Sequence, residues 1–101
     1  MQDSDFKLSH TKFFLKQFKE LTEKEKDLVN SKLDILKQNP FRYKKLNGYK
    51  NTFEIKITLN HNYSRLIYAT YMPEKNYITI FGIFKRKDEF KDFKRYLENN
   101  F

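Results

Sequence analysis

Three runs of sequence decide the fold of this chain: FEIKITL at 53–59, YSRLIYATY at 63–71 and YITIFGIF at 77–84. The first run alternates apolar with polar residues, which is the period of a strand with one face in a core. The third run is apolar at nearly every position and predicts a strand in the centre of a sheet. Turn-like residues at 60–62 and 72–76 separate the runs, so the sequence predicts three consecutive strands.

The residues before these strands predict two helices joined by a tight break. Ser9 or Thr11 can cap a first helix, whose apolar residues recur at helical spacing. Thr22 then lies three residues before Glu25, which is the spacing of a capping box at the start of a second helix. Together the two helices form a predicted helical hairpin.

The predicted order of elements along the chain is β-α-α-β-β-β-α. A short strand at 6–8 opens this order, and a helix over 88–97 closes it. Acidic residues begin the closing helix, where the helix dipole favours negative charge. The order predicts an α+β fold in a small single domain, residues 1–101, with an antiparallel sheet core, the helical hairpin on one face and a C-terminal helix.

The charge and composition of the chain limit the classes of function and partner that it can have. The net charge is +8, and residues 41–101 contain thirteen Lys and Arg against six Asp and Glu. Such an excess favours a polyanionic partner, most often nucleic acid, or an acidic protein, although a generally lysine-rich composition is the alternative. The chain has no cysteine, no apolar stretch typical of a signal peptide or membrane span, and no HExxH, CxxC, GxGxxG, Walker or GxSxG motif. We therefore expect a cytoplasmic protein without a metal or cofactor.

The strand segments contain the first candidate site residues. Glu54 and Lys56 lie two residues apart on the polar face of the first long strand. They form either a solvated surface pair or a site in which Glu54 acts as a general base. Arg65 lies in the next strand, where a guanidinium needs a partner, so Arg65 either pairs with Glu54 or clamps a phosphate.

More cations follow the third strand. Arg86 stands between Lys85 and Lys87 at the predicted start of the last helix, where backbone N–H groups add to the attraction for phosphate. The alternative is a solvated corner. His61 lies in a predicted turn and is either an exposed loop residue or a site residue. The other histidine, His10, is too distant from it in the sequence to indicate a shared metal site.

Four segments in this order resemble a known family: KLNG at 45–48, FEIKI at 53–57, YSRLIY at 63–68 and IFKRKDEF at 83–90. The pattern is similar to that of the RelE/ParE toxins of type II toxin-antitoxin modules. It comprises a Lys-Leu-x-Gly turn, a strand with alternating cations, an Arg-Leu-Ile-Tyr strand and an apolar strand that ends in a basic pair. With the helical hairpin, the resemblance covers nearly the whole chain.

The resemblance implies a function and roles for individual residues. RelE-like members are metal-independent, ribosome-dependent endoribonucleases that cut mRNA in the decoding site and are held inactive by a cognate antitoxin. In this chain, Lys56 matches a catalytic cation, Arg65 the arginine that clamps the phosphate, and Arg86 the arginine after the last strand. The expected RNA-binding residues are Lys45, His61, Lys85, Lys87 and Phe90.

Two positions depart from the family pattern. Glu54 stands where RelE has a lysine, and Phe90 stands where many members have a tyrosine. Phenylalanine can stack on a base but cannot exchange a proton. Either Glu54 replaces the basic residue as proton acceptor, or the chain cleaves RNA weakly or not at all. Two alternatives therefore stay open: a ParE-like inhibitor of DNA gyrase, and a non-catalytic RNA- or protein-binding module of the same fold.

Overall fold

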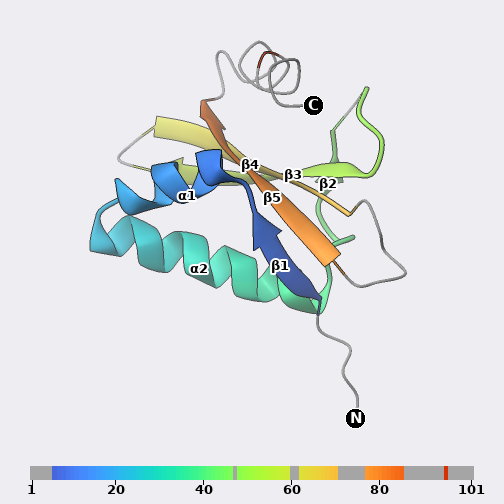
Figure 1. Ribbon diagram of the computed structural model, residues 1–101, viewed down its shortest axis with the longest axis horizontal. Coiled ribbons are helices and arrows are strands. Elements are labelled where there is room, and N and C mark those ends of the chain that lie inside the picture. Colours follow the sequence, from blue (N-terminus) through green and yellow to red (C-terminus); the bar gives the residue numbers. More distant parts are fainter. Residues whose placement is uncertain (1–5, 47, 60–61, 71–76, 86–94, 96–101) are drawn as a thin grey trace.

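The computed structural model describes residues 6–46, 48–59, 62–70, 77–85 and 95. Within them, five strands form one sheet in the order β1-β5-β4-β3-β2 (Figure 1). Their bounds are β1 Lys7–His10, β2 Lys44–Lys45, β3 Thr52–Leu59, β4 Asn62–Ala69 and β5 Tyr77–Lys85. The β2-β3, β3-β4 and β4-β5 pairs are antiparallel, whereas β1 runs parallel to β5. The described part of the chain is therefore an α+β domain with a mostly antiparallel sheet.

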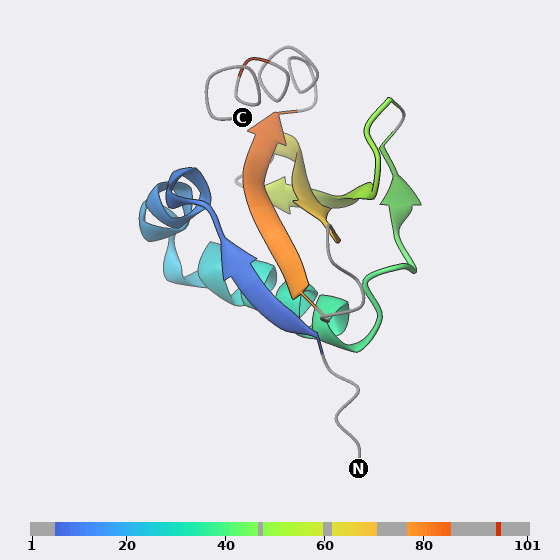
Figure 2. The same cartoon turned by 45° about the vertical axis from the view of Figure 1, so that its right-hand side comes forward.

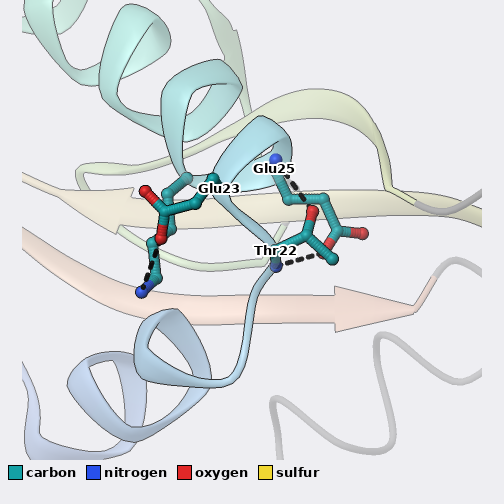
Figure 3. A network of polar contacts seen from close by, with 4 residues as sticks. Thr22, Glu23 and Glu25 are labelled. Carbon is teal, nitrogen blue, oxygen red and sulfur yellow. Dashed lines mark hydrogen bonds and ion pairs between the residues drawn. The ribbon is translucent and has the colours of Figure 1, made fainter.

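Two helices, α1 (Lys12–Lys19) and α2 (Glu23–Gln38), form the predicted hairpin. The predicted capping box of α2 is confirmed: Glu25 N donates to Thr22 Oγ1 at 3.2 Å, and Thr22 N donates to Glu25 Oε1 at 2.9 Å (Figure 3). Thr11 caps α1 by accepting a hydrogen bond from Phe14 N at 3.0 Å. Ser9, the other candidate cap, lies in β1 instead.

The main core lies between the helices and one face of the sheet. Buried side chains of β3, β4 and β5 pack there against Phe14 of α1 and against Val29 and Leu36 of α2. We call this side of the sheet the helix face. Because side chains alternate along a strand, the polar residues of β3 point to the opposite side, which we call the outer face. The alternation read from residues 53–59 thus assigns each residue of β3 to its face.

The position of β5 depends on contacts that start far away in the sequence. β1 covers only the first half of β5, as Figure 2 shows. Beyond this point Thr11 Oγ1 donates to the Phe81 carbonyl at 2.7 Å. The Gln17 side chain then donates to the Ile83 carbonyl and accepts from Ile83 N, both at 2.7 Å. The side chains of the N-cap Thr11 and of Gln17 in α1 therefore satisfy backbone groups that a bare strand edge would expose. The predicted central position of β5 is only partly met, because β5 is an interior strand next to β1 and β4 takes the centre of the sheet.

Gly82 is required where α1 approaches β5. A Cβ atom at this position would lie 2.8 Å from the Phe13 ring, which is closer than real Cβ contacts, and 3.0 Å from Gln17 Oε1, which is an unusually tight contact. The Phe13 ring instead stacks on Phe84, with ring centroids 5.7 Å apart. The absence of a side chain at Gly82 thus lets α1 pack against the second half of β5, the strand that precedes the predicted basic cluster.

Some details differ from the sequence expectation. The first strand spans Lys7–His10 rather than 6–8, and the sequence showed no signal for the short strand β2 or for the parallel pairing of β1 with β5. The C-terminal helix predicted over 88–97 lies outside the described residues, apart from Arg95, which has helical backbone conformation. Among the described residues, no helix is long and apolar enough to cross a membrane.

Candidate nucleic-acid site

The strand register gathers charged residues on the outer face. Lys56 of β3 lies directly opposite Arg65 of β4. One step along the ladder, Glu54 lies between Lys44 of β2 and Ile67 of β4. Residues directly opposite each other in antiparallel strands project to the same side. Lys44, Glu54, Lys56 and Arg65 therefore share the outer face.

Glu54 and Arg65 form a buried ion pair. The guanidinium Nη1 donates to Glu54 Oε1 at 2.5 Å, and the side chains of Glu54 and Arg65 are only 3% and 14% exposed. Ile67 and Phe84, which neighbour the pair on the ladder, are also buried. A charge removed from water in this way needs a close partner, and each residue supplies one to the other.

The ion pair shows which of the predicted partners Glu54 and Arg65 have in the structure. A solvated Glu54–Lys56 pair is wrong, because Glu54 is buried and bonds to Arg65, whereas Lys56 is exposed. The pairing of Arg65 with Glu54, one of the two predicted alternatives, is what the structure contains. A role of Arg65 in binding phosphate stays a prediction. The ion pair holds the guanidinium in one position, and a bound phosphate would have to meet it there.

A pocket of about 400 Å³ lies at the hairpin end of β3 and β4. It is lined by Lys56, Ile57, Thr58, Tyr63, Ser64 and Arg65. The lining combines two cations with hydroxyl groups and one aromatic ring, and the volume falls within the range of small-ligand sites. An anion with a planar group attached matches this set of side chains.

Two residues of the outer face escaped the sequence analysis. Lys44 faces the same side as Lys56, whereas the predicted Lys45 lies opposite Phe53, a residue of the helix-face core. Without knowledge of β2, nothing in the sequence distinguishes these adjacent lysines. Tyr63 was also missed, although its position two residues before Arg65 places both on one face of the strand.

The remaining predicted site residues are not placed. Arg86, Lys87, Phe90 and His61 lie outside the described residues. Lys85 is the last residue of β5 and pairs in register with Ser64 of β4. Lys85, the one described residue of the predicted basic cluster, therefore lies beside the strand that contains Arg65.

Tyr68 is a buried titratable residue on the helix face. Its hydroxyl group donates a hydrogen bond to the Pro40 carbonyl at 2.5 Å, which ties β4 to the segment after α2. Burial, and secondarily the neighbouring Tyr43, raises the pKa of Tyr68 above its ordinary value. Tyr68 is fully enclosed, so its role is structural rather than chemical.

The arrangement of two helices and a mostly antiparallel sheet defines a RelE-like fold. The free E. coli toxin RelE, solved as a double arginine-to-alanine mutant, superposes with a TM-score of 0.76 at 18% identity, over 96% of this chain and 99% of that one. RelE in the intact E. coli RelBE toxin-antitoxin complex gives 0.65 at 24% identity, over 80% and 95% of the two chains.

A third solved structure, the same RelE mutant bound to a peptide of the antitoxin RelB, gives a TM-score of 0.65 at 22% identity, over 89% and 94% of the two chains. No protein-family model matches this chain, and no curated protein does. The likeness therefore establishes the fold, and it extends over nearly the full length of both chains.

Proposed function

We propose that this chain is the cytoplasmic toxin of a type II toxin-antitoxin pair and acts as a metal-independent, ribosome-dependent mRNA endoribonuclease. The observation that supports this most is the pocket in which Lys56 stands opposite Arg65 on a RelE-like fold. The solved complexes of RelE with RelB support a further expectation, that a cognate antitoxin binds this chain and holds it inactive.

The proposed reaction is an internal transfer at the RNA backbone. A base takes the proton of a ribose 2′-OH, and the 2′-oxygen attacks the adjacent phosphorus. The bond from phosphorus to the 5′-oxygen breaks as an acid gives a proton to that oxygen. The products are a 2′,3′-cyclic phosphate and a 5′-hydroxyl end. Lys56 and Arg65 would stabilise the negative charge that develops on the phosphate, and Arg86 joins them in this proposal from its sequence position alone.

Glu54 is proposed to orient Arg65. Its carboxylate is bound to the guanidinium and is almost fully buried, so the pair presents Arg65 in a fixed direction toward the pocket. The carboxylate also offsets the charge of Arg65. Lys56, which is exposed, then supplies most of the net positive charge in the pocket.

The test is cleavage of an mRNA bound to purified ribosomes, with the cut positions mapped by primer extension. Wild-type protein is expected to make cuts in register with codons, and Lys56→Ala is expected to slow them about 10²- to 10³-fold through the loss of one charge-stabilising contact. Lys24→Ala, which removes an exposed lysine of α2 on the other side of the molecule, is the matched control and should cut normally.

Glu54→Gln separates orientation from proton transfer in the same assay. Glutamine keeps an oxygen that can accept from Arg65, so an orienting role predicts a loss below about tenfold and an unchanged pH profile. A proton acceptor predicts a loss of about 10²- to 10⁴-fold. If the message stays intact with all proteins and gyrase supercoiling is inhibited, the ParE-like alternative replaces the ribonuclease.

A further inference from the structure

Tyr63 has an unusual environment for a large side chain. It lies near the start of β4 and is 68% exposed, more than any other large hydrophobic side chain in the described part of the chain. Packing against the core therefore does not explain its ring. The neighbouring strand offers Thr58, which is directly opposite and also exposed.

The ring stands beside the two cations of the pocket. Tyr63 and Arg65 project from the same side of β4 about 6.5 to 7 Å apart along the strand. Lys56 faces Arg65 across the strand pair, at a Cβ separation of about 4.5 to 5.5 Å. All three side chains line the same pocket of about 400 Å³. An aromatic face, an ammonium group and a guanidinium group thus converge on one small volume.

This combination matches one nucleotide of a single strand. The cations suit a phosphate, and an exposed aromatic ring suits an unstacked base, whose face is available only where the nucleic acid is not a duplex. The hydroxyl group of Thr58, which lies opposite Tyr63 on the outer face, adds a polar partner for a ribose. An acidic peptide would use the cations but would leave the ring without a planar partner.

We infer that Tyr63 is a base-stacking residue for single-stranded RNA, and that the nucleotide stacked on it places its phosphate between Lys56 and Arg65. The inference rests on the proposed function for the identity of the nucleic acid. It adds the residue that seats the base beside the scissile phosphate, and it assigns that role to β4 rather than to the residues after β5.

The experiment measures binding of a fluorescein-labelled adenosine hexanucleotide by anisotropy at low salt, alongside an abasic oligonucleotide of equal length. For the wild-type protein, removal of the bases is expected to weaken binding. Tyr63→Ala should weaken binding of the intact RNA about 5- to 150-fold, the range for loss of one stacked base. Tyr63→Phe should bind as the wild type does, because phenylalanine keeps the ring.

Tyr77→Ala is the matched control, since Tyr77 is an exposed strand tyrosine, 41% exposed, that pairs with β1 rather than lining the pocket. On the abasic strand, Tyr63→Ala should cost nothing further. Equal losses on both strands, or Tyr63→Ala binding that matches the wild type, would overturn the inference. Stacking without ribosomal cleavage would refute the proposed ribonuclease and leave the stacking role of Tyr63 in place.

Discussion

The same strands present different kinds of side chain on the two faces of the sheet. On the helix face, apolar side chains of β3, β4 and β5 pack against α1 and α2. On the outer face, the same strands bury a carboxylate and a guanidinium beside Ile67 and Phe84 and leave Lys56 and Tyr63 exposed. Apolar burial requires no partner of fixed geometry, whereas a buried charge does. On the outer face the ion pair therefore holds the Arg65 side chain in a fixed orientation, as a binding site requires.

The largest expected effect comes from breaking the buried pair. Glu54→Ala leaves the Arg65 guanidinium without its carboxylate and is expected to lower the free energy of unfolding by about 3 to 5 kcal/mol. Urea unfolding followed by circular dichroism measures this change. The double replacement Glu54→Leu with Arg65→Met should cost much less than the single change, because no uncompensated charge remains. If the double variant loses as much free energy of unfolding as Glu54→Leu and Arg65→Met lose when added together, the two residues are not coupled.

A somewhat smaller effect is expected on the helix face. Leu36 is fully buried in the core between α2 and the sheet, so Leu36→Ala should lower the free energy of unfolding by about 2 to 5 kcal/mol. Leu28→Ala, in the same helix at a position that is 37% exposed, is the control, and its cost should be clearly smaller. Similar costs for the two variants would contradict the assignment of the helix face as the main core. RNA binding of folded Leu36→Ala should stay unchanged.

The smallest effect concerns the hydrogen bond of Tyr68. Tyr68→Phe leaves the Pro40 carbonyl without its donor and should cost about 1 to 3 kcal/mol near neutral pH. Because burial raises the pKa of Tyr68, the folded protein keeps the proton above pH 10, where an unfolded tyrosine loses it. This contribution is complete below about pH 10 and falls by up to about 1.4 kcal/mol per pH unit above it.

Urea unfolding of the wild type and Tyr68→Phe between pH 8 and 11 measures the pH effect. The stability difference between the two proteins should shrink as the pH rises above about 10. A constant difference across this range would mean that Tyr68 titrates alike in the folded and unfolded chains.

The sequence predicted the elements whose signals are local. The alternation at 53–59 and the spacing of Thr22 and Glu25 depend only on neighbouring residues, and both predictions are confirmed. The pairing of β1 with β5 joins the two ends of the described chain, and no local pattern encodes it. The side to which Lys44 or Lys45 projects depends on one step of register, because a shift by one residue moves every side chain to the other face.

The same reasoning applies to the site. The sequence named Glu54, Lys56 and Arg65, and the register brings Lys56 opposite Arg65 and lets Glu54 bind Arg65. Burial of the ion pair could not be predicted from residue types, because glutamate and arginine are usually exposed. The spacing of Tyr63 and Arg65 places both side chains on one face of the strand, but the high exposure of the Tyr63 ring is seen only in the structure.

The most direct test of the central claim is chemical analysis of the ends of mRNA recovered from ribosomes incubated with the purified protein. The account predicts new codon-positioned 3′ ends that carry a 2′,3′-cyclic phosphate, paired with 5′-hydroxyl ends, and their disappearance with Arg65→Ala in preparations shown to be folded. Message that stays intact at high protein concentration, or ends produced equally well by folded Arg65→Ala, would contradict it.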